Sequence, residues 1–594
     1  MARMDTTVAR THRFALSISG GISLGSYEAG VLTQLYRDLY DFNRNADIAG
    51  RARVAIDAVA GASAGSVTGL ILSQGIALKV PPDKLEAAMR LCWVELLEIH
   101  NLLKSSQGAE SVESLFTSAI FDDVVNGTLT IPPSKPEDPE EPIAFWITMT
   151  NLDGVPFVID FNREGHAQAT TALYALDYRD YVPFLISGDQ IEMIEKRMVS
   201  GAGPDAGSDE TWKDAVEAAK TSGAFPFAFP SHFQTRDLTA YPEYLKFREA
   251  VESNTLAKAA GEQDLHTTVG LPDKACFQFV DGGLFHNQPV GKCIDAVAYL
   301  NSRFPERDPD REENQKRAGR SFVIIEPEPQ LPSDVERALT NSASAQAGPP
   351  LPLLPKILGS YFNTALYGDF QTAADTNKKI HALNEALQKL DTLGLPHDVT
   401  APLKQQILKA VDLEDKTEIT LQRIPHELPT SKRLACAFGG HFGGFFREDF
   451  RQADFITGKH ESRQWFAEWL TLWLQEHGAA IFGDDRPITK EYTLSLLGAA
   501  PADPATEPIA PTGLTPLELA GSGWFPQPGA NGKISGVARL AALTEDERSE
   551  ILNLAEERGE TLLEAWLNLP SLVVHPAAYI LAHLFNNRWT KEPK

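Results

Sequence analysis

The 594-residue sequence has only four cysteines, and none of them stands in a Cys-x-x-Cys pair. Cys92, Cys276, Cys293 and Cys436 are widely spaced. This spacing is typical of reduced thiols in a cytoplasmic protein and excludes a disulfide framework. No His-Glu-x-x-His motif or cysteine–histidine cluster is present either. We therefore predict no bound metal and no cofactor.

Long apolar runs are also missing. No run of about 18 apolar residues exists, so the sequence predicts no membrane-spanning helix. The N-terminal stretch MARMDTTVARTHRF lacks the apolar core of a signal peptide. We expect a cytoplasmic protein, and the sequence leaves transient, peripheral contact with a membrane surface open.

Positive charge is scarce, because 54 lysines and arginines face 80 aspartates and glutamates, for a formal net charge of −26. This balance argues against a nucleic-acid partner and against long-range attraction to an anionic bilayer. Any lipid contact would have to be local and apolar. Hydrophobic residues make up 43% of the chain, as in ordinary globular proteins, and the length suits two or more domains or one large domain with an extension. The sequence does not indicate an oligomeric state.

Apolar runs alternate with helical periodicity through the first part of the chain. We expect strands over 14–19, 54–60, 143–150, 157–161, 276–281 and 321–329, and helices over 27–39 and 64–76. The tetrapeptide NLDG at 151–154 predicts a hairpin turn between two of these strands. The alternation favours an α/β fold with a mainly parallel central sheet.

The later part of the chain is mainly helical. Helical patterns cover 357–393 and 445–477, and 416–424 alternates like a strand. We predict a first domain over 1–335, a linker over 336–355, a mainly helical extension over 356–499 that packs on the first domain, and a C-terminal helical segment over 513–594. Stretches 131–142, 201–210 and 306–317 are rich in proline, glycine or charge and are expected to be solvated connections.

The sequence Gly61-Ala-Ser63-Ala-Gly65 lies between an expected strand and an expected helix. A G-x-S-x-G motif at such a sharp turn presents the serine as a nucleophile, and glycines allow neighbouring backbone to come close. Ser63 could equally serve as the N-cap of the helix. The pentapeptide alone leaves both interpretations open.

Two further stretches can carry chemistry. The glycine-rich loop Gly20–Gly25 follows the first expected strand, and such a loop can offer backbone N–H groups to an anion. It matches neither nucleotide-binding pattern, G-x-G-x-x-G or G-x-x-x-x-G-K-[ST]. Asp281 stands at a strand end before Gly282 and Gly283 and can point into a cleft, although an aspartate there can also simply form an Asx turn.

Together these stretches resemble the three signature blocks of the patatin-like phospholipase family, in the family's order. The blocks are the glycine loop at 20–25, G-x-S-x-G at 61–65, and D-G-G-x-x-x-N-x-P at 281–289. The stretch AAKTSGAFPFAFPSH at 218–232 is also similar to a family segment, and 446–461 resembles a stretch of long bacterial patatin-related proteins. The resemblance covers roughly residues 12–330 and implies a three-layer α/β/α fold.

The resemblance implies that Ser63 and Asp281 form a catalytic dyad without histidine. It implies a hydrolase of fatty-acyl esters, with phospholipids, lysophospholipids or neutral lipids as substrates. The candidate oxyanion-hole donors are the N–H groups of Gly20, Gly21 and Ile22, and the motif-supporting residues are Gly25, Gly61, Gly65, Gly282, Gly283 and Asn287. Because aspartate normally titrates near about 3.9, such a dyad needs burial that raises the carboxyl pKa and a strong oxyanion hole.

The glycine loop departs from the family pattern G-G-G-x-[RK]-G at two positions. Ile22 replaces the third glycine, and its β-branched side chain predicts a negative φ. Leu24 replaces the basic residue, which would weaken anion stabilisation or change headgroup preference. Two other functions therefore stay open: a catalytically decayed binding or scaffold protein, and an esterase for small soluble acyl substrates. We expect His286 to face away from the dyad, and Arg447 and Arg451 to pair with nearby acids.

Overall fold

The computed structural model of the chain describes the following residues: 10–103, 114, 116, 142–160, 172–199, 208–226, 228–252, 271–308, 318–329, 353–391, 397–411, 413, 418–426, 433–437, 441–509, 513–521, 527–528, 534–535, 549 and 553–554. The predicted loop stretches are 131–142, 201–210 and 306–317, of which 131–141, 201–207 and 309–317 lie outside these residues. The greater part of the predicted linker and most of the segment 513–594 also lie outside them. The loop prediction is wrong for 208–210, which begin a helix.

One mixed sheet forms the centre of the molecule. Its strands are β1 (Arg10–Ile18), β2 (Ala52–Gly61), β3 (Ile143–Asp160), β4 (Ala172–Ser187), β5 (Gln190–Met193), β6 (His232–Asp237), β7 (Lys274–Asp281), β8 (Ala318–Ile325) and β9 (Leu421–Ile424). Their order is β5-β4-β3-β2-β1-β8-β9, with β7 beside β3 and β6 beside β7. Within the series β3-β2-β1-β8-β9, neighbouring strands pair in parallel. The pairs β3–β4, β4–β5, β3–β7 and β6–β7 are antiparallel. The predicted α/β class is confirmed.

Helices cover both faces of the parallel strands. Along β1, Phe14, Leu16 and Ile18 point into the larger core, while Ala15 points into a second core on the opposite face. This period of two with both faces apolar is typical of parallel strands buried between helices. The larger core includes residues of α1 (Gly25–Arg44), α2 (Ala64–Ala77) and α3 (Pro82–Arg90), and the second core includes residues of α10 (Val290–Arg303). The predicted three-layer α/β/α arrangement is therefore present.

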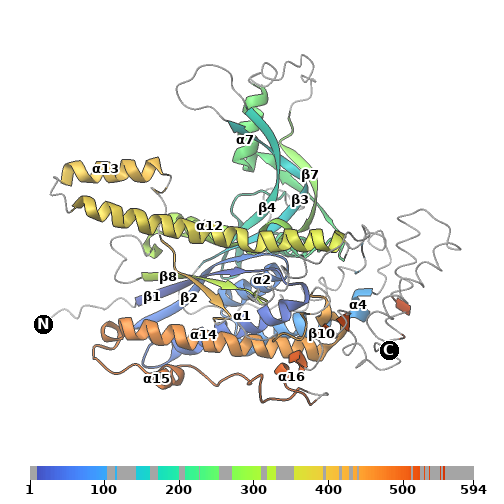
Figure 1. Cartoon of the computed structure of the whole chain (residues 1–594), viewed down its shortest axis with the longest axis vertical. Helices are drawn as coiled ribbons and strands as arrows, with labels where there is room; N and C mark the ends of the chain where they lie inside the picture. The colour runs from blue at the N-terminus through green and yellow to red at the C-terminus, as the bar shows by residue number, and fades with distance from the viewer. Residues whose placement is uncertain are drawn as a thin grey trace.

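The later helices are α12 (Leu353–Asp391), α13 (His397–Ala410), α14 (Glu448–Phe482), α15 (Lys490–Ser495) and α16 (Pro516–Gly521). Helices α12 and α14 lie against this body, α13 contacts α12, and α15 and α16 contact α14. Helix α14 runs beside α1 on one side of the sheet, and α12 runs across the other side (Figure 1). The ring of Trp469 on α14 lies 4.6 Å from the ring of Phe14 on β1, so α14 belongs to the larger core. The helical patterns over 357–393 and 445–477 correspond to α12 and α14.

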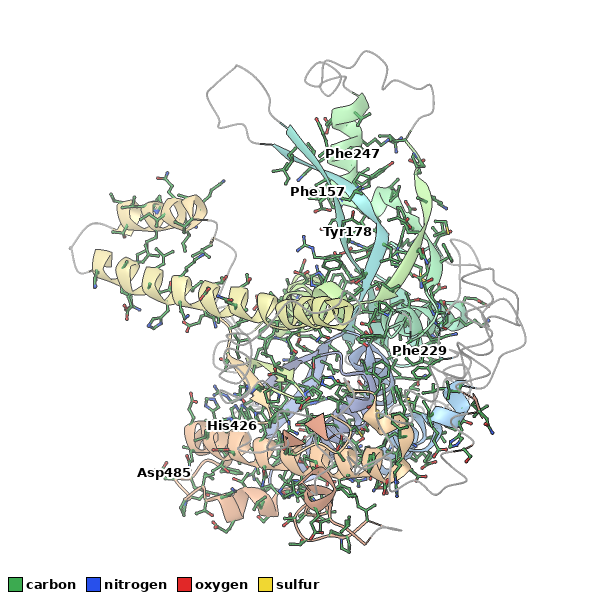
Figure 2. All side chains as sticks on the ribbon, turned by 45° about the vertical axis from the view of Figure 1, so that its right-hand side comes forward. Phe157, Tyr178, Phe229, Phe247, His426 and Asp485 are labelled. Carbon is green, nitrogen blue, oxygen red and sulfur yellow. The ribbon has the colours of Figure 1, made fainter. Side chains whose placement is uncertain are left out.

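The ends of β3 and β4 project from the body together with α7 (Pro242–Glu252) (Figure 1). Phe157, Tyr178 and Phe247 lie on this projecting part, whereas Phe229 lies closer to the body (Figure 2). The remaining described elements include α4 (Ile99–Leu103), α6 (Ser208–Ser222), α9 (Gly283–His286) and the short strands β10 (Gln527–Pro528) and β11 (Ile534–Ser535). Short helical turns are η1 (Ile22–Leu24), η2 (Leu91–Leu96), η4 (Leu238–Ala240), η5 (Pro305–Arg307) and η6 (Gly443–Phe446).

The predicted hairpin at 151–154 is wrong, because β3 continues through this stretch. Both halves of β3 pair with β4, and the register shifts between Thr150 and Val155. The side-chain oxygen of Asn151 accepts the N–H groups of Asp153 and Gly154, each at 3.0 Å, and Gly154 has a φ of +75°. This local turn absorbs the extra residues as a bulge without reversing the chain.

Two predicted ion pairs are confirmed. Arg447 pairs with Asp449 at 2.8 Å, and Arg451 pairs with Glu98 at 3.4 Å. Strand β9 is shorter than the predicted 416–424 and begins at Leu421. None of the helices in the described ranges has the length and apolar character needed to cross a membrane.

Candidate active site

Ser63 occupies a sharp turn between β2 and α2. Its backbone has φ +52° and ψ −124°, a conformation that costs energy for any residue other than glycine. A Cβ atom at Gly65 would lie 2.5 Å from the carbonyl oxygen of Ile18 and 2.7 Å from that of Ser19, so only glycine fits there. The side chain of Ser63 makes no capping hydrogen bond to α2. Ser63 therefore stands at the N-cap position of α2 without capping the helix through its side chain, and its strained strand-to-helix turn is the geometry expected of a nucleophile elbow.

Asp281 stands at the end of β7 and contacts Ser63 directly. The Ser63 hydroxyl donates to Oδ2 of Asp281 at 2.6 Å, and the Gly283 N–H donates to Oδ1 at 2.6 Å. The Asp281 side chain is almost fully buried, and this burial raises its pKa to about 7. The hydrogen bonds from Ser63 and Gly283 act in the opposite direction and lower the pKa.

No imidazole lies between these two side chains, because they bond to each other. His286 is on α9, and its backbone N–H donates to the Gly282 carbonyl oxygen at 3.0 Å. A Ser–His–Asp triad would instead place the histidine between the serine and the aspartate. The geometry is that of a two-residue arrangement.

Ser222 at the end of α6 connects the turn of Ser63 to the turn of Asp281. Its Oγ accepts the N–H of Ser63 at 2.9 Å and lies 2.8 Å from Oγ of Ser66. Its carbonyl oxygen accepts the N–H of Gly282 at 3.1 Å. The similarity of 218–232 to a family segment was the sequence signal for this region, but it did not single out Ser222.

The glycine loop packs directly against Ser63. A Cβ atom at Gly20 would lie 2.8 Å from Cβ of Ser63. The Gly20 N–H donates to Oδ1 of Asn287 at 3.0 Å, so Asn287 ties the glycine loop to the loop that follows Asp281. Among the residues that the structure describes, the N–H groups of Gly21 and Ile22 have no hydrogen-bond partner. These two N–H groups are therefore unbound in the described structure, whereas that of Gly20 is already engaged.

The backbone at Ile22 differs from the prediction. Its φ is +52°, although a β-branched side chain disfavours this region. The next residue explains how the conformation persists, because the N–H of Ser23 is bound by the carbonyl oxygen of His441 at 3.1 Å. A distant segment of the chain therefore holds the loop in a conformation that its own sequence disfavours.

Leu24, which stands where the resemblance places a basic residue, points into the core. Its side chain is 1% exposed. The neighbouring Gly25 lies against the ring of Trp93 and leaves no room for a side chain. A cation at position 24 in this conformation would be buried and would not face an incoming substrate.

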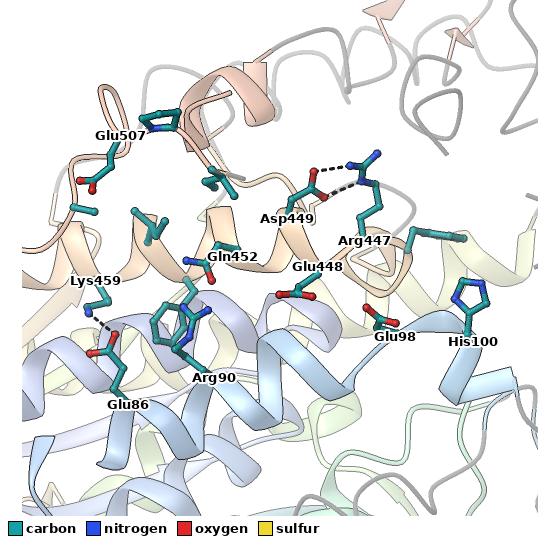
Figure 3. A pocket seen from close by; sticks show the side chains of 16 residues that line it. Glu86, Arg90, Glu98, His100, Arg447, Glu448, Asp449, Gln452, Lys459 and Glu507 are labelled. Atoms are coloured by element: carbon teal, nitrogen blue, oxygen red, sulfur yellow. Dashed lines mark hydrogen bonds and ion pairs between the residues drawn. The ribbon is translucent and has the colours of Figure 1, made fainter. Parts of the chain in front are cut away.

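A separate cavity of about 690 Å³ lies between α3, α14 and the stretch 502–509 (Figure 3). Half of its 16 lining residues are charged, and they include the ion pairs Glu86–Lys459 and Arg447–Asp449. Neither Ser63 nor Asp281 lines it. Within the described part of the chain, no three His, Cys, Asp or Glu side chains are grouped to hold a metal ion.

Comparison with known proteins places this site in a family context. Residues 16–294 match the family model described as patatin-like phospholipase. The match contains the glycine loop, the turn of Ser63 and the Asp281 motif, and it shows that this part of the chain has the patatin fold. A relative described as the uncharacterized protein y4iI of Sinorhizobium fredii is 22% identical over 521 residues. That alignment covers 78% of this chain but only 65% of the relative.

Proposed function

We propose that the patatin-like domain of residues 16–294 is a serine lipid acyl hydrolase that cleaves fatty-acyl esters through an acyl-enzyme. The match to the family model supports hydrolysis of lipid esters as the class of activity. The 2.6 Å hydrogen bond between Ser63 and Asp281, at a strained turn beside a glycine loop, is the observation that carries the assignment. Phospholipids, lysophospholipids and neutral lipids are the proposed substrates.

In the first half-reaction, Ser63 Oγ attacks the ester carbonyl carbon while Oδ2 of Asp281 takes the hydroxyl proton. The negative charge that develops on the carbonyl oxygen is stabilised by the N–H groups of Gly21 and Ile22 and by the positive end of α2. Gly20 keeps its bond to Asn287 and maintains the close contact with Ser63. The protonated Asp281 then donates its proton to the leaving alcohol, and acyl-Ser63 remains.

In the second half-reaction, Asp281 takes a proton from a water molecule that attacks acyl-Ser63, and the fatty acid leaves as Ser63 recovers its proton. A carboxyl group with a pKa near 7 is a much better base than an ordinary aspartate, because its pKa is closer to that of the groups it serves. No step requires a metal ion, so chelators should not reduce the activity.

The alternative of a decayed scaffold rested on the missing basic residue at Leu24. The burial of Leu24 weakens this argument, because the side chain at this position faces the core. An esterase for small soluble substrates would use the same dyad, so only substrate comparison can separate it from a lipid hydrolase.

The test is fatty-acid release from a phospholipid, a lysophospholipid, a triacylglycerol and a short-chain ester, with chelator present. We expect the long-chain esters to be cleaved, and both Ser63→Ala and Asp281→Asn to lose about 10²–10⁴-fold in kcat with the fold intact. Near-wild-type hydrolysis by Asp281→Asn together with inactivation by a histidine substitution would replace the dyad with a triad. Cleavage of the short ester alone would favour the small-substrate esterase, and no cleavage at all would favour the scaffold.

A further inference from the structure

A segment of the C-terminal region, residues 441–446, packs against the glycine loop beside Ser63. This segment contains η6 and leads into α14, and it lies well outside the residues that match the family model. The glycine loop and this segment are more than 400 residues apart in the chain, with a separation of 418 between Ser23 and His441.

Ser23 forms the contact with this segment through three hydrogen bonds. The carbonyl oxygen of His441 accepts both the backbone N–H of Ser23, at 3.1 Å, and the Ser23 hydroxyl. The Ser23 hydroxyl oxygen in turn accepts the N–H of Gly444 at 3.1 Å. Ser23 is 1% exposed, so water does not compete for these bonds. The residue directly after the proposed donor Ile22 is thus fixed on its backbone and on its side chain.

Several residues at or next to this contact have a strained backbone conformation. Five non-glycine residues in the described ranges have a positive φ, and three of them are Ile22, Ser63 and His441. Strained residues persist only where surrounding structure holds them, and they concentrate at functional sites. His441 is held by its own ring, whose Nε2 lies 2.8 Å from Oε2 of Glu328 just beyond β8.

Arg451 on α14 fixes the other end of the contact. Its side chain is 1% exposed, and it donates to the carbonyl oxygens of Gly444 and Val94, each at 2.7 Å. Its third partner is Glu98, which also lines the charged cavity of Figure 3. A guanidinium group suits this role because its planar donors can bind several fixed acceptors at once.

We propose that segment 441–446 is a built part of the active site: it holds the oxyanion-hole loop in its working conformation, with Ser23 and Arg451 as positioning residues. The proposal rests on the function proposed above. The segment touches no reacting atom, and it acts by keeping the N–H groups of Gly21 and Ile22 aimed at the carbonyl oxygen of the substrate.

Loss of this contact should weaken binding of the transition state more than binding of the substrate. Oxyanion-hole donors bind the charge that develops during reaction, so misplacing them lowers kcat more than it raises KM. Removing one such donor outright costs about 10²–10³-fold in kcat. Loosening the loop should cost less than this, about 10–10²-fold.

The first test replaces Ser23 with alanine in the full chain. Ser23→Ala removes two of the three hydrogen bonds and should lower kcat by about 10–10²-fold, with KM within about twofold of wild type. The matched control is Ser321→Ala, which also removes a buried serine hydroxyl that bonds to a histidine, His12 at 3.0 Å. Ser321 lies on β8, and we expect this control to keep wild-type kcat.

A second test inserts a methyl group into the contact. A Cβ atom at Gly444 would lie 2.8 Å from Oγ of Ser23 and 2.7 Å from Sγ of Cys436, so Gly444→Ala should displace the segment from Ser23 and lower kcat. On α14, a Cβ atom at Gly478 would meet only ordinary contacts at 3.5 Å or more, so Gly478→Ala is the control. Arg451→Lys, which keeps one charged donor, should retain more kcat than Arg451→Met.

The outcomes separate this inference from the function on which it rests. If wild type is active and Ser63→Ala is not, but Ser23→Ala and Gly444→Ala keep wild-type kcat, the positioning role is wrong while the hydrolase assignment stands. If both variants lower kcat only in proportion to a lost folded fraction, seen as a matching loss of titratable active sites, the segment is merely structural and the proposal fails. Inactive wild type would overturn the proposed function itself.

Discussion

At the scale of single residues, the proposed chemistry depends on a buried carboxyl group that must still lose its proton. Asp281 is surrounded by protein and bonds only to Ser63 and Gly283 through its side chain in the described structure. Burial disfavours the charged carboxylate, and the two hydrogen-bond donors partly restore it. The balance places its pKa at about 7, where the group can accept a proton from serine and return it within one turnover.

This pKa predicts how activity depends on pH. The base is competent only when deprotonated, so kcat/KM should rise with pH through a midpoint near 7 and then reach a plateau. The measurement is kcat/KM from pH 5 to 9 on an uncharged ester, whose own ionisation cannot contribute. A midpoint near 4 would show that Asp281 titrates as an ordinary aspartate and that burial does not tune it.

At the scale of structural elements, the site is built where strands end. The glycine loop follows β1, and Ser63 follows β2, so both lie at the same edge of the parallel sheet. Ligand sites in open α/β sheets are found at the carboxyl ends of the strands, because the loops that follow parallel strands lie at the same edge. Strand β7 brings Asp281 to the same place by pairing antiparallel with β3, where Asp281 lies opposite Met149.

The glycine loop gives a prediction about position 24. Leu24→Arg places a charge without a partner in the core and should reduce the free energy of unfolding by about 3–5 kcal/mol. It should not increase the use of anionic headgroups. Leu24→Met, a volume-conserving control, should cost less than about 1.5 kcal/mol in the same denaturant titration. A stable Leu24→Arg variant with a new preference for anionic lipids would mean that this side chain reaches the substrate.

Much of this element structure could be predicted from local sequence. Short apolar runs located β1 and β2, and each of the three motifs stands at a strand end. The pairing of Ser63 with Asp281 came instead from the resemblance of these motifs to the patatin-like phospholipase family. The errors arose from contacts that local sequence does not show. The side chain of Asn151 accepts the N–H groups of Asp153 and Gly154 and so forms a bulge. The carbonyl oxygen of His441 binds Ser23, the residue after Ile22, although the two residues are 418 positions apart in the chain. Ser222, 159 residues from Ser63, was missed for the same reason.

At the scale of the whole molecule, the net charge of −26 bears on the proposed action on lipid substrates. Anionic bilayers should repel it, while zwitterionic and neutral surfaces should not. Lipid contact must then come from local apolar groups, and large apolar side chains remain exposed on the projecting sheet, for example Leu173 (51%) and Leu176 (44%).

The charge predicts a salt dependence that differs between surfaces. The Debye length falls from ~10 Å at 0.1 M to ~3 Å at 1 M salt, so repulsion from anionic vesicles weakens as salt is added. Initial rates on anionic vesicles should therefore rise several-fold over this range, while rates on zwitterionic vesicles of matched acyl composition stay flat. A preference for anionic vesicles at low salt would reveal a local basic surface that outweighs the overall charge.

The central claim is that Ser63 is a nucleophile activated by Asp281, and labelling with a fluorophosphonate tests it most directly. The probe forms a covalent bond to an activated serine without requiring the correct lipid substrate. We predict one label per chain, located on Ser63 by peptide mass spectrometry, absent in Ser63→Ala and slowed about 10²-fold or more in Asp281→Asn. Labelling that persists in Ser63→Ala, or that proceeds at the wild-type rate in Asp281→Asn, would contradict the account.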